Sequence, residues 1–211
     1  MTENIDLKSL EKKAYRSTFE DGIWDIFLGL LVLNIGLGPL FSMFINLPEF
    51  WDTLTFSIVF CAIAFLIFYL GKKYITVPRI GYVKFGAKRT SKLLKLKIFL
   101  FVVFILNIVL FILPLSGILN YADIQPLLIT LILGFGVFTI PFCIVAYFLD
   151  FTRLYYYALS IGLGLFLADL LTPIIGVPLD IIIVFSPLGG VIVFIGLVYF
   201  ISFLRKYTLS K

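Results

Sequence analysis

Long apolar runs separated by short polar stretches fill most of this 211-residue chain. A helix needs about 20 apolar residues to cross the hydrocarbon core of a membrane. Runs of this kind predict six spanning helices, over residues 22–44, 51–70, 96–115, 126–149, 154–171 and 179–204. The pattern therefore predicts an all-α polytopic membrane protein with a polar N-terminal segment over 1–21 and one transmembrane domain over 22–211.

The basic residues occupy alternate connections between these spans. Nine of the 17 Lys and Arg residues lie between Lys72 and Lys97, most of them in a basic loop over 71–95. The others precede the first span, follow the sixth, or stand at Arg153, and the three remaining connections have no Lys or Arg. Basic loops stay on the cytoplasmic side of a membrane. We therefore expect both termini and the basic loop in the cytoplasm, and an even number of spans in the cell membrane.

Composition supports the membrane assignment and limits the chemistry. The chain is 62% hydrophobic and 14% charged, whereas soluble domains are about 45–50% apolar and about 25% charged. It has no His, and its two cysteines, Cys61 and Cys143, are far apart, so we expect no metal site and no cofactor. Basic residues beside apolar runs favour anionic lipid headgroups over nucleic acid as the binding partner.

The basic loop itself has two interpretations. Residues 75–85 are rich in β-branched and aromatic residues, which predicts extended or turn-like structure. Residues 88–97 alternate lysine with apolar residues and are expected to begin a cytoplasmic extension of the third span. The loop is either a simple determinant of orientation or a surface for a lipid headgroup or a partner. The candidate contact residues are Arg79, Lys84, Lys88 and Arg89.

Asp52 and Asp180 stand at the second residue of their predicted spans and belong with the connections. Two other carboxylates lie within predicted spans, where an ionised group is costly and usually faces a partner or water. Asp25 lies one turn into the first span. It either pairs with a basic residue of the loop, Arg79 or Arg89, or belongs to a cation or proton site. Asp169 lies near the outer end of the fifth span, where it is either solvated or part of such a site.

Glycines follow a regular spacing in the first span. Gly22, Gly29 and Gly36 are seven residues apart and fall on one helical face. Glycine allows another backbone to approach closely, which is how membrane helices commonly pack. Asn34 lies away from this face. We therefore expect the first span to pack against neighbours on two sides.

Proline and glycine interrupt the fourth and sixth spans, at Pro141 and Pro187. A proline frees the carbonyl group four residues earlier, and a freed carbonyl within lipid needs a partner. Either these prolines only kink their helices, or they mark discontinuous helices that line a transport pathway.

A weak repeat relates the odd-numbered spans. Residues 33–38, 106–111 and 159–164 each place a polar residue inside an apolar run, and the first two place Asn34 and Asn107 in the same position. A true repeat would give three two-helix hairpins in parallel orientation. Chance similarity explains the pattern equally well in a composition this biased.

Two segments carry a family resemblance, Phe19-Glu20-Asp21-Gly22-Ile23-Trp24-Asp25-Ile26-Phe27-Leu28-Gly29 and Val77-Pro78-Arg79-Ile80-Gly81-Tyr82-Val83-Lys84-Phe85. In these segments, the chain resembles prokaryotic multi-pass membrane proteins of uncharacterised function. The resemblance covers roughly the first 90 residues and implies no activity. If the two segments lie together in the fold, Asp25 and Arg79 are expected to form a pair on the cytoplasmic face.

The sequence leaves two functions open. Nucleophile and metalloprotease motifs are missing from the sequence, so we expect no enzyme. The first function is a small-solute or ion transporter or channel, with Asn34, Asn107, Pro141 and Pro187 along the pathway. Six short helices enclose little space, so such a protein is expected to be a homo-oligomer. The alternative is a membrane scaffold or accessory subunit that binds a partner or anionic lipid through the basic loop.

Overall fold

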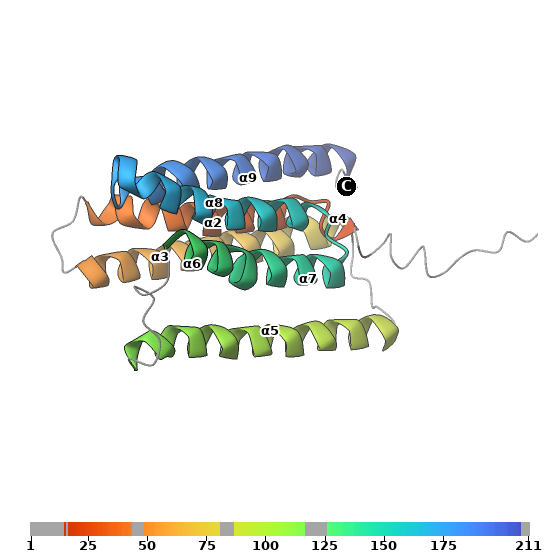
Figure 1. The fold of residues 1–211 in the computed structure, drawn as a ribbon. Coiled ribbons are helices and arrows are strands. Elements are labelled where there is room, and N and C mark those ends of the chain that lie inside the picture. Colours follow the sequence, from red (N-terminus) through yellow and green to blue (C-terminus); the bar gives the residue numbers. More distant parts are fainter. Residues whose placement is uncertain (1–14, 16, 44–48, 81–86, 117–125, 208–211) are drawn as a thin grey trace, which may run out of the picture. The chain divides into compact units, whose positions relative to one another are not determined.

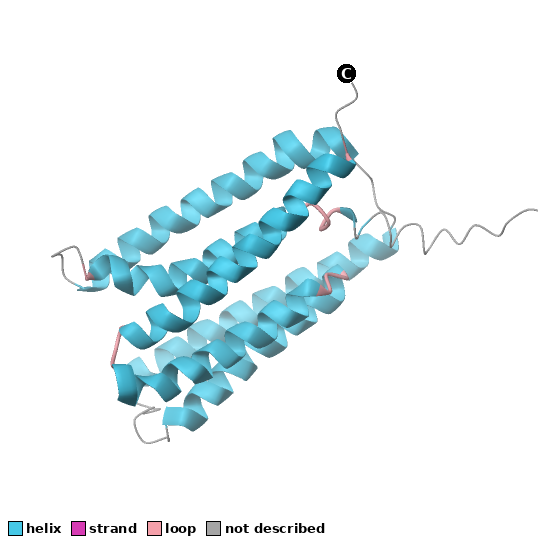
Figure 2. Ribbon diagram, turned by 90° about the horizontal axis from the view of Figure 1, so that it is seen from above, coloured by secondary structure: helices cyan, strands magenta, loops and turns pink. Residues whose placement is uncertain are grey.

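A computed structural model describes residues 15, 17–43, 49–80, 87–116 and 126–207. These residues form helices joined by turns and include no strand (Figure 1, Figure 2). The long helices are α2 (Ile23–Ser42), α3 (Glu49–Leu70), α5 (Ala87–Leu115), α8 (Arg153–Ile175) and α9 (Leu179–Lys206). The shorter helical segments are η1 (Gly71–Thr76), α4 (Val77–Ile80), α6 (Pro126–Ile132), η3 (Leu133–Thr139) and α7 (Ile140–Leu149).

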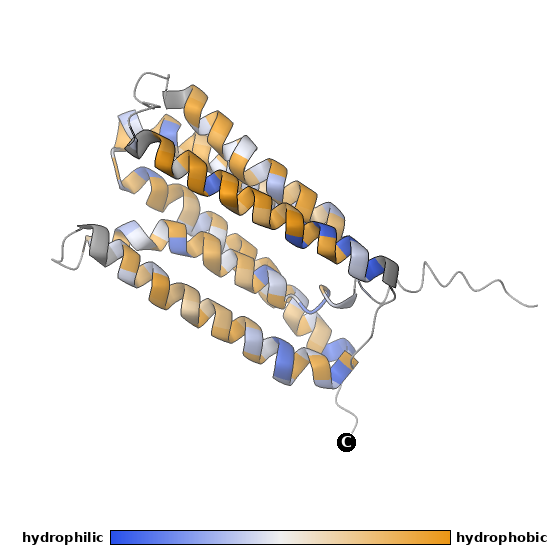
Figure 3. Cartoon of the chain, turned by 90° about the horizontal axis from the view of Figure 1, so that it is seen from below, coloured by the Kyte–Doolittle hydropathy of each residue, from blue (hydrophilic) through white to orange (hydrophobic). Residues whose placement is uncertain are grey.

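Six helical stretches are long and apolar enough to cross a membrane, which confirms the predicted number of spans. They cover Ile23–Ser42, Thr53–Ile80, Arg89–Leu110, Leu128–Leu149, Arg153–Ile175 and Leu179–Lys206. Apolar residues lie along most of each stretch (Figure 3). Helix α5 begins at Ala87, so the predicted extension of the third span is confirmed as helix. Most of the predicted polar N-terminal segment, residues 1–14 and 16, lies outside the described residues.

The chain divides into two compact units. The first unit contains residues 1–85 and 186–211, and the second contains residues 86–185. The first therefore holds α2, α3, η1, α4 and most of α9. The second holds α5, α6, η3, α7, α8 and the start of α9.

A wide helical turn corrects the prediction of extended structure over residues 75–85. The chain stays helical from α3 through η1 and α4 to Ile80, and the residues after Ile80 lie outside the described part. In η1, the backbone N–H of Val77 donates to the carbonyl group of Lys72, five residues earlier. This π-type bonding precedes Pro78, which lies in the first turn of α4, where a missing N–H costs little. Proline therefore follows a widened turn here and does not end the helix.

The fourth span has the same device, and the sixth does not. In η3, the N–H of Ile140 donates to the carbonyl group of Phe135, again five residues earlier, and Pro141 follows directly. Helix α9, by contrast, runs without a break through Pro187. Of the two interpretations of Pro187, the structure therefore excludes the discontinuous helix, and Pro187 is accommodated within one helix.

Helix α2 packs against α9 through glycines on both helices. A Cβ atom built on Gly29 would lie 2.7 Å from the backbone nitrogen of Val193, and one built on Gly189 would lie 2.6 Å from that of Leu33. At the start of α2, Gly22 faces the carbonyl oxygen of Gly196 and has a φ of 70°. The predicted packing role of Gly22 and Gly29 is confirmed, and the partner surface on α9 has its own seven-residue glycine spacing.

The opposite side of α2 packs against α3 mainly through aromatic rings. The ring centroids of Trp24 and Phe68 lie 4.6 Å apart near one end, and those of Phe41 and Phe56 lie 4.6 Å apart near the other. Between them, the amide nitrogen of Asn34 lies 3.9 Å from the sulfur of Cys61. Helix α2 therefore has neighbours on two sides, as the sequence predicts (Figure 1).

In the second unit, α8 packs closely against the widened turn of the fourth span. A Cβ atom on Gly134 would lie 2.8 Å from the carbonyl oxygen of Gly162. The hydroxyl group of Thr139 fills the remaining space beside Gly162 and lies within hydrogen-bond distance of two carbonyl groups. Glycine, threonine and the π turn together let the two backbones meet.

Two adjacent glycines of α9 provide a matched test of the packing between α2 and α9. We expect Gly189→Ala to destabilise the protein by about 2–3 kcal/mol, because the new methyl group meets the backbone of Leu33. Gly190→Ala has open space around its Cβ position, and alanine favours helix, so stability should stay equal or rise by up to about 1 kcal/mol. Thermal unfolding of the detergent-purified variants measures both effects. Equal stabilities of the two variants would contradict this account of the packing.

Candidate functional site

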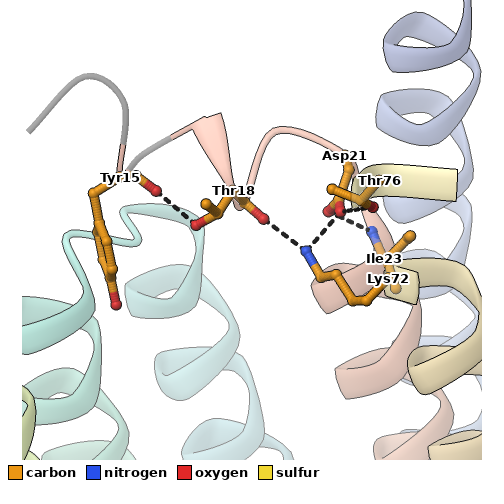
Figure 4. A network of polar contacts seen from close by, with 6 residues as sticks. All are labelled: Tyr15, Thr18, Asp21, Ile23, Lys72 and Thr76. Atoms are coloured by element: carbon orange, nitrogen blue, oxygen red, sulfur yellow. Dashed lines mark hydrogen bonds and ion pairs between the residues drawn. The ribbon is translucent and has the colours of Figure 1, made fainter. Parts of the chain in front are cut away.

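A buried polar cluster closes one end of the first unit, where the chain enters α2 and leaves α3 (Figure 4). Lys72 donates from Nζ to Asp21 Oδ2 at 2.6 Å, and the hydroxyl group of Thr76 donates to the same oxygen at 2.6 Å. The other carboxylate oxygen of Asp21 accepts the backbone N–H of Ile23 at 3.2 Å. Lys72 also donates to the carbonyl oxygen of Thr18 at 2.6 Å. We call Thr18, Asp21, Lys72 and Thr76 the first polar cluster.

Local sequence explains how these groups meet. Lys72 and Thr76 are four residues apart on η1, so they share one helical face. Gly22 adopts a left-handed conformation directly after Asp21, which a residue with a Cβ atom rarely does. The carboxylate of Asp21 therefore reaches the first turn of α2 and the face of η1 together.

Burial makes the ion pair of the first polar cluster energetically important. The side chain of Asp21 is fully buried, whereas 20% of the Lys72 side chain is exposed. Asp25 is also fully buried, and its charge acts on the same Lys72 ammonium group. Removing one member of a buried ion pair typically costs about 3–5 kcal/mol. Asp21 and Lys72 are therefore held together strongly.

The contacts that the structure gives for Arg79 are to backbone carbonyl groups, so the pair of Asp25 with Arg79 stays a prediction. The guanidinium group of Arg79 donates to two such groups, that of Tyr207 at 3.0 Å and that of Ile75 at 3.2 Å. The contact with Tyr207 joins α4 to the residue that follows α9. A carboxylate that the structure does pair with the basic loop in this unit is Asp21, which the sequence interpretation did not select.

A second polar cluster, formed by Arg89, Lys92 and Asp150, lies within the second unit. Asp150 follows α7 in a left-handed conformation, with a φ of 53°. Its Oδ2 atom lies 2.7 Å from Arg89 Nη1 and 3.5 Å from Lys92 Nζ, both on the first turns of α5. Lys92 also lies 5.1 Å from the ring centroid of Tyr147. Arg89, predicted to contact lipid or a partner, is thus largely buried against a carboxylate.

The two asparagines of the predicted pathway are bonded differently. Asn107 donates to the carbonyl group of Val103 on its own helix at 2.8 Å. The Oδ1 atom of Asn34 is buried and has no hydrogen-bond partner among the described residues. Ser186, directly before Pro187, has a hydroxyl oxygen that is also buried and has no hydrogen-bond partner among the described residues. Asn34 and Ser186 both belong to the first unit, and Asn107 belongs to the second.

The remaining candidates lie within the second unit or outside the described residues. Asp169 accepts a hydrogen bond from Thr130 at 3.0 Å, and Asp180, which the sequence interpretation did not select, accepts one from Thr172 at 2.6 Å. Pro141 lies at the start of α7. Lys84 lies outside the described residues, and only the backbone of Lys88 is described, in the first turn of α5.

The described residues hold no group of three His, Cys, Asp or Glu side chains able to bind a metal ion. Comparison with known proteins adds no assignment: no protein-family model, no curated protein and no solved structure matches this chain.

The hydroxyl group of Thr139 offers a test of the packing in the second unit. It lies 3.2 Å from the Gly134 carbonyl oxygen and 3.1 Å from that of Ala158. We expect Thr139→Val to lower stability by about 1–2 kcal/mol, because a buried carbonyl group loses its donor. Thr139→Ser keeps the hydroxyl group and serves as the matched control. Thermal unfolding should rank the serine variant above the valine variant, and the reverse order would contradict the proposed role.

Proposed function

We propose that this membrane protein is a transporter or channel for a small solute or ion, and that its first unit carries the pathway. The observation that supports this most directly is the buried Oδ1 atom of Asn34, near the middle of α2, which has no hydrogen-bond partner in the described part of the chain. No catalytic reaction is part of the proposal. We further propose that the protein lies in the cell membrane as a homo-oligomer.

The amide group of Asn34 is buried at an energetic cost. A buried carbonyl oxygen without a donor costs about 1–3 kcal/mol. A leucine at this position would avoid the cost and would suit a helix that packs within lipid. A polar atom maintained at such a cost at membrane depth is typical of a residue that contacts a transported species. The hydroxyl group of Ser186, also buried without a partner in the first unit, supports the same interpretation.

Other polar groups in the spans are less suited to this role. Asn107 uses its amide group on its own helix, and Asp169 accepts a hydrogen bond from Thr130. The hydroxyl group of Thr139 serves helix packing. The pathway proposed here therefore depends on Asn34 and not on Asn107.

An exposed lysine favours the second candidate function, an accessory protein that binds anionic lipid. Lys73 is exposed and lies 5.6 Å and 5.4 Å from the ring centroids of Tyr69 and Tyr74. Aromatic rings with a cation between them are common at membrane interfaces. If this function is the main one, neutralising Lys73 and Arg79 will impair the protein, whereas changing Asn34 will not.

Flux through reconstituted vesicles tests the transport proposal. Proteoliposomes should lose an imposed gradient of Na⁺, K⁺ or protons, or swell in a permeating neutral solute, at least about ten times faster than protein-free vesicles. Asn34→Leu should reduce this rate to the protein-free value, because the polar contact is lost, and Asn107→Leu should leave it unchanged. The two variants are matched in chemistry, and both must unfold at the wild-type temperature. Equal rates for a folded Asn34→Leu variant and the wild type would overturn the proposal.

The proposed orientation is tested with single cysteines introduced into a chain that lacks Cys61 and Cys143. Ser116 and Lys73 are both exposed and lie next to acidic and basic connections, respectively. A membrane-impermeant maleimide should label Ser116→Cys on intact cells, and should label Lys73→Cys only after the cells are opened. Labelling of Lys73→Cys on intact cells would contradict a cytoplasmic basic loop.

A further inference from the structure

The ammonium group of Lys72 is held by oxygen atoms in the way that a bound cation would be. Its Nζ atom lies 2.6 Å from the carbonyl oxygen of Thr18 and 2.6 Å from Asp21 Oδ2. The hydroxyl oxygen of Thr76 lies 2.6 Å from the same carboxylate oxygen (Figure 4). A carbonyl, a carboxylate and a hydroxyl oxygen are hard ligands, which suit small non-transition metal cations.

The charges around this position also favour a cation. Asp21 and Asp25 are both fully buried, and both act electrostatically on the Lys72 ammonium group. A buried carboxylate left without a counter-charge is strongly destabilising. Any species that replaces the ammonium group must therefore bring one positive charge, and a monovalent cation does so without changing the buried charge.

We propose that the first polar cluster is a binding site for a small monovalent metal cation, Na⁺ or Li⁺, and that Lys72 is a tethered competitor for it. This inference rests on the proposed transport function and names the class of its substrate. Lys72 is suited to leave the site, because a fifth of its side chain is exposed and its stem is long and flexible. The hydroxyl group of Thr76 can then rotate and turn a lone pair toward the cation.

The charge of the site also distinguishes this proposal from a divalent site. Divalent cations such as Ca²⁺ take six to eight oxygen ligands and several carboxylates, as a general rule. Within the described part of the chain, no group of three acidic, His or Cys side chains is present. Among the described residues, Asp21 is the one carboxylate hydrogen-bonded to Lys72, and its charge of −1 matches a directly bound cation of charge +1.

The test uses Lys72→Met, which removes the competitor and keeps the length of the side chain. In choline chloride, we expect the Tm of the purified variant to fall by about 10 °C, because the Asp21 carboxylate loses its counter-charge. At the same ionic strength, NaCl or LiCl should raise that Tm by about 5 °C or more, since a cation that binds the folded state stabilises it. Lys73→Met is the matched control, because Lys73 is the adjacent lysine but points to exposed tyrosine rings. Its Tm in choline chloride should stay at the wild-type value, because Lys72 still neutralises Asp21, and its response to NaCl or LiCl should equal that of the wild type.

Binding of radioactive ²²Na⁺ to the wild-type protein keeps the proposal testable if Lys72→Met does not fold. Equilibrium dialysis should show saturable binding of about one ion per chain. Asp21→Asn should bind the ion with an affinity at least about tenfold lower. No saturable binding by the wild type, or equal binding by Asp21→Asn, would overturn the inference. So would a Lys72→Met variant whose Tm is identical in sodium, lithium and choline chloride.

These readouts separate the cation site from the transport proposal. Binding and Tm are measured without vesicles, whereas Asn34→Leu is tested by flux. A wild-type protein that binds ²²Na⁺ but carries no solute across vesicles would support the cation site and contradict transport. If flux depends on Asn34 but the protein does not bind ²²Na⁺, that result would support transport and contradict the cation site.

Discussion

The close contact between the backbones of α2 and α9 requires glycine on both helices. Within lipid, no hydrophobic driving force brings helices together, so association depends on close packing and on polar contacts. Gly29 and Gly189 provide the packing, because a single Cβ atom on either would meet the opposing backbone within 3 Å. This contact fixes the position of α2, and it thereby fixes the two carboxylates at the start of that helix.

The positions of the polar groups follow from the cost of burying them. In each unit, one buried or largely buried carboxylate is paired with a cation from the basic loop, Asp21 with Lys72 and Asp150 with Arg89. Such pairs offset desolvation only when their geometry is good and their other hydrogen bonds are made. Asn34 departs from this pattern, since its carbonyl oxygen is buried and without a partner. The contrast between the Asp21 carboxylate, both of whose oxygens accept hydrogen bonds, and the amide oxygen of Asn34 is the basis of the transport proposal.

The widened turns η1 and η3 show how a local sequence shapes the site. Each contains a glycine, then a threonine five residues later, then a proline two residues beyond: Gly71, Thr76 and Pro78 in one, and Gly134, Thr139 and Pro141 in the other. In both, the threonine is buried and its hydroxyl group donates to a group outside its own turn. The proline favours the wide turn because it cannot donate a helical hydrogen bond. The threonine is then directed at a neighbouring segment.

Hydrophobic pattern alone was enough to predict the six spans, because each span requires a long apolar run. The seven-residue glycine spacing was likewise enough to predict that Gly22 and Gly29 pack closely. The helical course of residues 75–80 was not predicted, because Pro78 and the β-branched residues around it favour extended structure unless a π turn precedes them. The pairing of Lys72 with Asp21 could not be predicted from spacing, since 51 residues separate them. For the two widened turns, the sequence did offer a signal, which is the repeated spacing of glycine, threonine and proline.

Much of the candidate site was beyond prediction for a related reason. Asn34 and Asn107 look equivalent in sequence, yet the environment of each amide differs once α3 packs against α2. Asp21 stands at the edge of an apolar run, where a carboxylate is usually solvated, and only the left-handed turn at Gly22 brings it inside. Such contacts depend on tertiary packing and not on helical periodicity.

Counterflow through vesicles that contain the purified wild-type protein tests the central claim most directly. Vesicles loaded with unlabelled Na⁺ and placed in a trace of ²²Na⁺ should accumulate the label transiently, well above protein-free vesicles, because a carrier exchanges bound ions across the membrane. Accumulation that disappears when the internal sodium is replaced by choline is the result that this account predicts. Uptake equal to that of protein-free vesicles would contradict it and would favour the accessory function.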